Sequence, residues 1–251
     1  KAGGLMKKKI FAVVLIFTMT VTSFTAIAEK IDSENKDNTI TEENTEENKD
    51  EGTEENTETD NTETEEESKF SDIEDDAWYF DSVNFVTERG IMSGTSETEF
   101  SPNDSATRGM IALIMKNIEN DPRKVYWSYF DVKEDAWYAD AVAWCSETGI
   151  MKGYGGGLFG PDDYVTREQL VSILYNYAKY KNFGNMETNG IELLAYKDYA
   201  DVSGYAGGPM QWALKNQIIS GKDGNKLDPK GIASRAEIAQ IIRNFMVFYN
   251  L

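Results

Sequence analysis

The sequence contains no histidine and only one cysteine, Cys145. A disulfide within the chain is therefore impossible, and the commonest zinc or haem ligand and general base is missing. Any catalysis would have to use carboxylates, lysine or tyrosine, and no such group stands out as a catalytic constellation. We therefore predict no catalytic residue, no metal site and no cofactor, and we expect Cys145 to be a small buried hydrophobic residue.

Residues 29–69 lack aromatic side chains, and their only large apolar residues are Ile31 and Ile40. The same segment carries 18 acidic residues against four lysines, which is most of the chain's formal net charge of −19. So little apolar surface cannot offset the entropy of ordering a backbone, and like charges keep a chain extended. The composition predicts a disordered acidic linker, acting either as a spacer or cation-attracting brush, or simply as a solvated connection.

Residues 1–28 contain four lysines and no acidic residue. The basic run Lys7–Lys9 precedes an apolar stretch, and the small-x-small pattern Ala26-Ile27-Ala28 that follows is one that signal peptidase accepts. Threonines and a serine interrupt the stretch, which makes it marginal for spanning a bilayer. We predict a signal peptide, with membrane contact only during export; an uncleaved membrane anchor is the alternative. Residues 1–5, before Met6, are interpreted as a non-native leader or a fragment edge.

Beyond residue 69 the chain repeats itself three times, which decides the fold class. The first copy consists of Phe70-Ser-Asp-Ile, Asp76-Ala-Trp-Tyr, Gly90-Ile-Met-Ser-Gly94, Phe100-Ser-Pro102 and Thr107-Arg-Gly-Met110. The second copy repeats all five elements with a displacement of 59 residues. The third is looser and is aligned on Tyr199-Ala-Asp-Val, Gln217-Ile-Ile-Ser-Gly221, Leu227-Asp-Pro229 and Ser234-Arg-Ala-Glu237; it lacks the Asp-Ala-Trp-Tyr element.

The apolar spacing within each copy is typical of two helices. In the second copy the first helix is expected to stop at Gly149, a good residue for a left-handed C-cap. The second helix is expected to start at a capping box, formed by Thr166 with Gln169 and, in the third copy, by Ser234 with Glu237. One such helix pair cannot bury its apolar face alone, so the three second helices are predicted to form a shared bundle that the third pair closes.

These motifs resemble the S-layer homology domain family, whose Asp near the repeat start, Gly-Ile-x-x-Gly, Phe-x-Pro and Thr-Arg-Ala-Glu segments occur here in order over residues 70–249. The resemblance implies a mainly α fold, in which three tandem helix-loop-helix repeats form a pseudo-trimeric helical bundle. We place the copies at 70–128, 129–198 with a connector, and 199–251. The resemblance also implies non-covalent binding of secondary cell-wall polysaccharide, often carrying pyruvate ketals, in grooves between adjacent repeats on a Gram-positive surface.

One arginine per copy, Arg108, Arg167 or Arg235, is expected at the first residue of a helix, where the helix dipole disfavours a cation. Free helix-start amides beside a guanidinium make an anion site, and a guanidinium can hold a carboxylate through two parallel hydrogen bonds. We therefore predict that these arginines bind a glycan carboxylate, such as that of a pyruvate ketal. The alternative is that each pairs with a local acid. We expect the groove that contains Arg167 to be the best preserved of three unequal grooves.

The other candidate polysaccharide-binding residues recur at equivalent positions of the copies or differ between them: Asp72, Asp131, Asp201, Trp78, Trp137, Gly94, Gly153, Gly221 and Lys152. The aspartates accept sugar hydroxyls or cap a turn, and the glycines admit a sugar to the backbone or satisfy a turn that needs a positive φ. The two tryptophans stack on a sugar ring or pack at a helix start. The lysine supplies a cation to one groove only.

Two other functions were weighed against glycan binding. A wall-active glycosidase would use paired carboxylates, but no acidic pair stands apart from the repeat pattern. A calcium-dependent adhesion module is suggested by Asp223-Gly-Asn225, although Leu227 occupies a position where a calcium loop needs a ligand. The acidic net charge disfavours nucleic acid as a partner.

Overall fold

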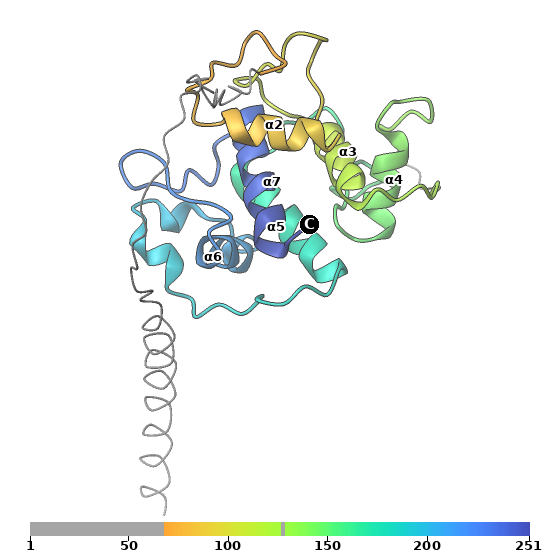
Figure 1. Ribbon diagram of the computed structural model, residues 1–251. Coiled ribbons are helices and arrows are strands. Elements are labelled where there is room, and N and C mark those ends of the chain that lie inside the picture. The colour runs from red at the N-terminus through yellow and green to blue at the C-terminus, as the bar shows by residue number, and fades with distance from the viewer. Residues whose placement is uncertain (1–67, 127–128) are drawn as a thin grey trace, which may run out of the picture. The chain divides into compact units, whose positions relative to one another are not determined.

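The computed structural model describes residues 68–126 and 129–251 (Figure 1). The predicted signal peptide, and all but the last two residues of the predicted linker, lie outside these residues. The helices there are α2 (Phe80–Glu88), α3 (Arg108–Glu119), α4 (Ala139–Glu147), α5 (Arg167–Tyr180), α6 (Gly207–Lys215) and α7 (Arg235–Tyr249), with short 3₁₀ helices η1 (Glu192–Ala195) and η2 (Tyr199–Asp201). Within the described residues β-pairing is limited to isolated bridges, which confirms the mainly α prediction.

The second helix of each copy starts at a side-chain N-cap. The hydroxyls of Thr107, Thr166 and Ser234 accept hydrogen bonds from the amide three residues later, at the starts of α3, α5 and α7. In α5 and α7 the third helical residue, Gln169 or Glu237, also accepts from the N-cap amide, so both predicted capping boxes are confirmed. Such caps stabilise a helix by about 1 kcal/mol and fix where it begins.

The first helix of each copy ends where the backbone turns left-handed. Gly90 and Gly149 follow α2 and α4 with φ of 66° and 73°, so the expected C-cap role of Gly149 is confirmed. In the third copy a non-glycine residue, Gln217, takes this conformation after α6 with φ of 56°. A side chain adopts that region at some conformational cost, which glycine avoids.

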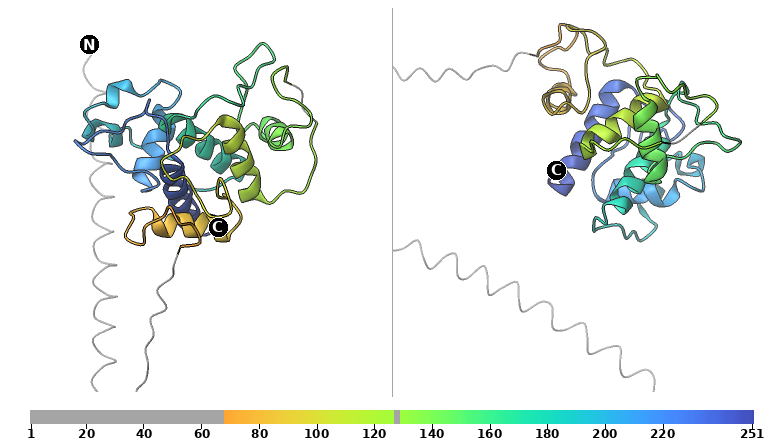
Figure 2. Two further views of the ribbon diagram at one scale, coloured as in Figure 1. Left: turned by 90° about the horizontal axis from the view of Figure 1, so that it is seen from above. Right: turned by 90° about the vertical axis from the view of Figure 1, so that its right-hand side faces the viewer.

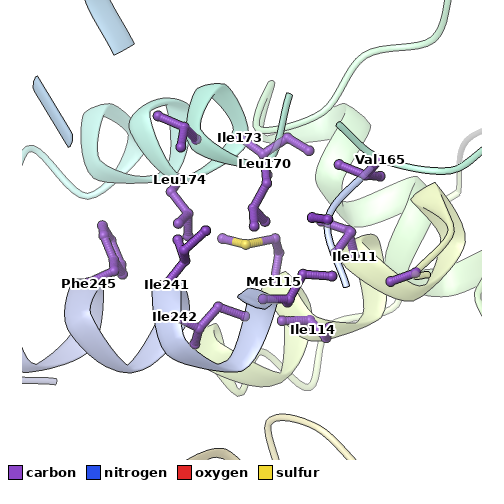
Figure 3. Packing of buried hydrophobic residues seen from close by; sticks show 14 of the residues in the cluster. Ile111, Ile114, Met115, Val165, Leu170, Ile173, Leu174, Ile241, Ile242 and Phe245 are labelled. Atoms are coloured by element: carbon purple, nitrogen blue, oxygen red, sulfur yellow. The ribbon is translucent and has the colours of Figure 1, made fainter. Parts of the chain in front are cut away.

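The three second helices meet in one apolar core, as predicted. Figure 3 shows side chains of α3, α5 and α7 pointing toward one another, among them Ile111, Met115, Leu170, Leu174 and Ile242. Each of these five is fully buried. Because full burial of such a side chain contributes about 1.5–3 kcal/mol, this cluster supplies a large share of the folding energy.

The first helix of each copy packs against the second helix of another copy. Helix α4 of the second copy lies against α3 of the first, α6 of the third against α5 of the second, and α2 of the first against α7 of the third. Figures 1 and 2 show α2 beside α7 from three directions, although they lie at opposite ends of the repeat region. Each copy therefore buries the first helix of the next, and the α2–α7 contact closes the ring.

Candidate functional site

The three arginines lie where the sequence predicts, at the first residues of α3, α5 and α7, but they are buried. Arg108, Arg167 and Arg235 are only 5–7% exposed. Each reaches into the loop of the following copy and donates from Nε and Nη2 to two backbone carbonyls. The acceptors are Phe159 and Lys152 for Arg108, Leu227 and Ser220 for Arg167, and Phe100 and Ser93 for Arg235. The arginines thus join the copies into a closed ring.

The prediction of an anion site at free helix-start amides is wrong, because these amides are already hydrogen-bonded. In α3 the amides of Arg108 and Gly109 donate to the carbonyls of Asp163 and Pro161 in the next copy, and the third amide donates to the Thr107 hydroxyl. The same pairs recur at the starts of α5 and α7. With the amides and two of the five guanidinium N–H groups already engaged, a ligand carboxylate can bind these arginines only through the remaining N–H groups of Nη1 and Nη2.

The aspartates near the repeat starts cap a turn. Asp72 accepts hydrogen bonds from the amides of Phe100 and Ser101, at 2.8 and 2.7 Å. Asp131 does the same for Phe159 and Gly160. Burial acts to raise the pKa of Asp131, but these amide hydrogen bonds outweigh it and hold the pKa below the ordinary value of 3.8. Both carboxylates therefore serve the fold.

The equivalence of Asp201 with these two aspartates is wrong. Asp198 accepts from the amides of Leu227 and Asp228, both at 2.8 Å, whereas Asp201 ends η2 and is exposed. The third copy therefore aligns on Tyr196-Lys-Asp198, and one further residue separates it from the Gly221 segment. The repeated Tyr-x-Asp spelling at 196–198 and 199–201 made the two registers similar in sequence.

None of the three candidate glycines, Gly94, Gly153 and Gly221, has a positive φ. Glycine is required at these positions because a neighbouring aromatic ring approaches the backbone too closely for a Cβ. A Cβ at Gly94 would come within 2.5 Å of the Phe70 ring, and one at Gly221 within 2.5 Å of the Tyr196 ring. The expected alternative of a turn that needs a positive φ is therefore wrong for all three. Each glycine lets the aromatic residue at its repeat start cover the turn.

A cleft of about 740 Å³ brings part of the predicted set together. It contains Arg167 from the second copy, Gly221 and the adjacent loop from the third, and Trp78 from the first. Helix α7 forms one wall through Gln240, Ile241 and Asn244. Trp78 is 63% exposed and meets the Tyr79 ring edge to face, so its indole is available to a ligand. All three copies contribute to this cleft.

The cleft contains cations that acidic residues hold in place. Lys222 Nζ lies 2.6 Å from Glu237 Oε1 and 3.0 Å from Asp228 Oδ2, and Arg167 Nη1 lies 3.7 Å from the same Glu237 oxygen. Lys226 also lines the cleft. A ligand carboxylate that entered here would meet two cations already brought together and would compete with Glu237 for them.

The other copies arrange the same positions differently. Trp137 is 58% exposed and lines a separate cavity of about 230 Å³ against α3. The Tyr154 ring lies over the Arg108 guanidinium, 4.6 Å from ring centroid to Cζ, at the position that Lys222 has in the third copy. Lys152 is exposed, and its carbonyl accepts from Arg108. The three grooves are therefore chemically unequal.

The third copy replaces its missing Asp-Ala-Trp-Tyr element with a hydrogen-bonded cluster around Glu168, which is 2% exposed. Glu168 accepts from the Ser203 amide and hydroxyl, the Tyr205 hydroxyl and the Lys230 ammonium. Burial acts to raise the pKa of Glu168, but the hydrogen bonds, that from Lys230 foremost, lower it below the ordinary value of 4.5. In the first copy the equivalent residue is Gly109, which leaves room for a tyrosine ring.

Sequence reasoning missed one asparagine in each copy. Asn117, Asn176 and Asn244 donate from Nδ2 to the carbonyls of Ile91, Ile150 and Ile218. Each lies nine residues after the helix-start arginine, a constant spacing that the sequence displays. These bonds tie each second helix to its own Gly-Ile-x-x-Gly segment. Lys222 was also missed, because its position holds a different residue in each copy.

Two further findings apply to residues 68–126 and 129–251. No group of three or more acidic or cysteine side chains there is arranged to hold a metal ion. None of the helices in the same ranges is both long and apolar enough to cross a membrane. Cys145 is fully buried, which confirms its expected place in the core, and Trp144 and Trp212 are fully buried as well.

Comparison with known proteins supports the three-copy organisation. The model of the S-layer homology domain matches residues 69–109, 128–171 and 195–239. The chain is 32% identical over 174 residues to an exoglucanase, XynX, of Acetivibrio thermocellus, and 31% identical over 179 residues to an amylopullulanase of Thermoanaerobacterium thermosulfurigenes. It is 29% identical over 175 residues to the S-layer protein sap of Bacillus anthracis. These alignments cover 69–71% of the chain and only 16%, 9% and 20% of the respective relatives.

Proposed function

Since the chain belongs to the S-layer homology domain family, which attaches proteins to the cell wall, we propose that it anchors by binding an acidic, pyruvylated wall polysaccharide in the Arg167 cleft. The observation that carries this proposal is the cleft itself. It combines Lys222 and Arg167 Nη1 with the exposed indole of Trp78. Paired cations suit a carboxylate, and an aromatic face suits the apolar side of a sugar ring.

The route to the wall belongs to the same proposal. We propose that the N-terminal signal directs export from a Gram-positive-type cell, and that the acidic segment then connects the anchor to its surroundings. The relatives include surface-layer proteins and glycan-degrading enzymes that are several-fold longer than this chain. What the anchor attaches to the wall is therefore not a property of the repeat region itself.

The binding test uses the full chain and walls with or without their pyruvate. The chain should co-sediment with native walls, and removal of pyruvate should weaken binding by about ten-fold, as expected for loss of a charge-assisted contact. Lys222→Gln and Trp78→Ala should each weaken binding to native walls by several-fold. Both positions are partly exposed, so the variants are expected to fold.

Matched controls are available within the repeats. Trp137 is the second-copy equivalent of Trp78, and Trp137→Ala removes its exposed indole from the separate cavity against α3. Lys152→Gln removes a cation near Arg108. If the proposal is right, both changes have smaller effects on wall binding than Trp78→Ala and Lys222→Gln. Equal binding to walls with and without pyruvate would refute recognition of the carboxylate.

The two rival functions are tested with the same material. A carboxylate glycosidase would release reducing ends from wall polysaccharide, and we expect none. A calcium-dependent adhesion module would lose wall binding in a chelator, whereas anchoring through Lys222 and Arg167 should persist.

A further inference from the structure

Acidic side chains offset the cations of the Arg167 cleft. The charged residues that line it are equal in number by sign: the cationic Arg167, Lys222 and Lys226 and the acidic Asp223, Asp228 and Glu237. The lining therefore has no excess positive charge that would attract an anion. Its affinity for a ligand carboxylate depends on whether one of the acids gives up its place beside the cations.

Glu237 is the acid that stands in that place. Its Oε1 lies 2.6 Å from Lys222 Nζ and 3.7 Å from Arg167 Nη1, so one carboxylate oxygen neighbours both cations. Asp228 Oδ2 lies 3.0 Å from Lys222 Nζ, but in residues 68–126 and 129–251 Asp228 forms no ion pair with Arg167. Asp223 is exposed. Glu237 therefore occupies the position between two cations that a ligand carboxylate would take.

The start of α7 fixes the Glu237 side chain in this position. Its Oε2 accepts a hydrogen bond from the Ser234 amide at 3.2 Å, as part of the capping box, and the side chain is 15% exposed. A competing group that belongs to the same molecule acts at a high effective concentration. Since a ligand binds only to the fraction of molecules whose site is open, an internal competitor lowers the apparent affinity.

The cap itself does not require a negative charge at this position. The equivalent residue is Gln169 in α5 and Met110 in α3, so the third copy alone carries an acid here. Gln169 completes its capping box with an amide oxygen, which accepts from the Thr166 amide at 3.0 Å. The charge of Glu237 is therefore available for a role in the cleft that is separate from its role in the helix.

We propose that Glu237 is an internal competitor, which holds Lys222 and Arg167 in the free cleft and is displaced from them by the ligand carboxylate. This inference rests on the proposed function, since the ligand is taken to be an acidic sugar. A small free carboxylate makes no further contact and cannot displace Glu237. A carboxylate on a sugar that also contacts Trp78 can do so. Glu237 thereby makes the cleft select a sugar-borne carboxylate over small anions.

The test measures the affinity of the full chain, by calorimetry, for a single repeating unit of a pyruvylated wall polysaccharide and for the same unit without its pyruvate. Glu237→Gln should tighten binding of the pyruvylated unit by about ten-fold, as for a hydrogen bond to a charged group that no longer has to be broken. Binding of the pyruvate-free unit should not change. Asp223→Asn, an equal charge change at an exposed residue of the same cleft, should tighten binding far less.

Two further measurements test the displacement itself. In a Lys222→Gln background, Glu237→Gln should lose most of its effect, because the cation that Glu237 holds is absent. Sodium acetate should compete with the pyruvylated unit no better than sodium chloride in wild type, and better than sodium chloride in Glu237→Gln. Acetate that competed equally with both proteins would refute the role in selectivity.

A purely structural role for Glu237 predicts the opposite change in affinity. If the carboxylate only held the cleft in shape, Glu237→Gln would weaken binding of both units, and that result overturns the proposal. An equal gain in Asp223→Asn would overturn it as well, because net charge would then explain the effect. If wild type binds both units equally, the proposed function fails. If wild type prefers the pyruvylated unit and Glu237→Gln binds it no more tightly, only the internal competitor fails.

Discussion

Replacing Arg235 should destabilise the repeat region strongly, because this side chain links the third copy back to the first. Its Nε donates to the Phe100 carbonyl at 2.8 Å and its Nη2 to the Ser93 carbonyl at 2.5 Å. A hydrogen bond to a charged group contributes about 1.5–3 kcal/mol. Arg235→Met should therefore lower the free energy of unfolding by about 3–6 kcal/mol, against a typical total of about 5–15 kcal/mol.

Urea unfolding, followed by the fluorescence of buried Trp144 and Trp212, measures this loss. Arg235→Lys keeps the charge but not the planar fork, so it should fall between wild type and Arg235→Met. The control is Arg243→Met on the same helix: Arg243 is partly exposed and 3.8 Å from Asp81, so about 0.5 kcal/mol or less is expected.

The reasoning would be refuted if Arg235→Met unfolded at the wild-type urea concentration. That result would mean that the buried guanidinium contributes nothing to the ring, and that its place at the helix start serves a ligand alone. A stability loss equal to that of Arg243→Met would carry the same meaning.

Three further predictions concern other parts of the fold. Because the pKa of Glu168 is lowered in the folded state, its stabilising contribution is present above pH 4.5 and is lost as the pH falls below that value. The difference in unfolding free energy between wild type and Glu168→Gln, measured in urea titrations, should therefore shrink between about pH 6 and about pH 3. A constant difference would contradict this. Gly149→Ala should cost about 1 kcal/mol through its positive φ alone, because a Cβ there meets nothing. Gly153 has no positive φ, but Gly153→Ala should cost clearly more, because its Cβ would clash with the Leu158 carbonyl; equal costs in calorimetric scans would refute the steric argument. Burial raises the pKa of the Cys145 thiol, so a thiol reagent should label it only when the protein unfolds, and rapid labelling of native protein would show that the site opens.

The helices and their caps could be predicted because the signals are local. Thr166 with Gln169, and Ser234 with Glu237, lie three residues apart, so their capping boxes depend on one helical turn. Gly149 specifies a left-handed residue through its own missing side chain. The apolar stripes of the second helices likewise predicted the shared core.

The role of each candidate site residue could not be predicted in the same way. Asp198 and Asp201 each stand two residues after an aromatic residue, as Asp72 does, so the sequence alone does not show which of them corresponds to Asp72. Only the hydrogen bond to a turn some 28 residues later identifies Asp198 as the equivalent. The arginine at each helix start was placed correctly, but its partners lie in another copy, so its burial and its role as a link between copies were not visible.

The sequence by itself determined that this protein has three copies of one helical unit and where the second helix of each copy begins, because those properties depend on residues within a few positions of one another. Only the tertiary structure decided which copy each helix packs against, and that Trp78, Arg167 and Lys222 share one cleft. The physical reason is separation along the chain: Arg235 contacts carbonyls 135 and 142 residues away, and such contacts follow from closure of the whole ring.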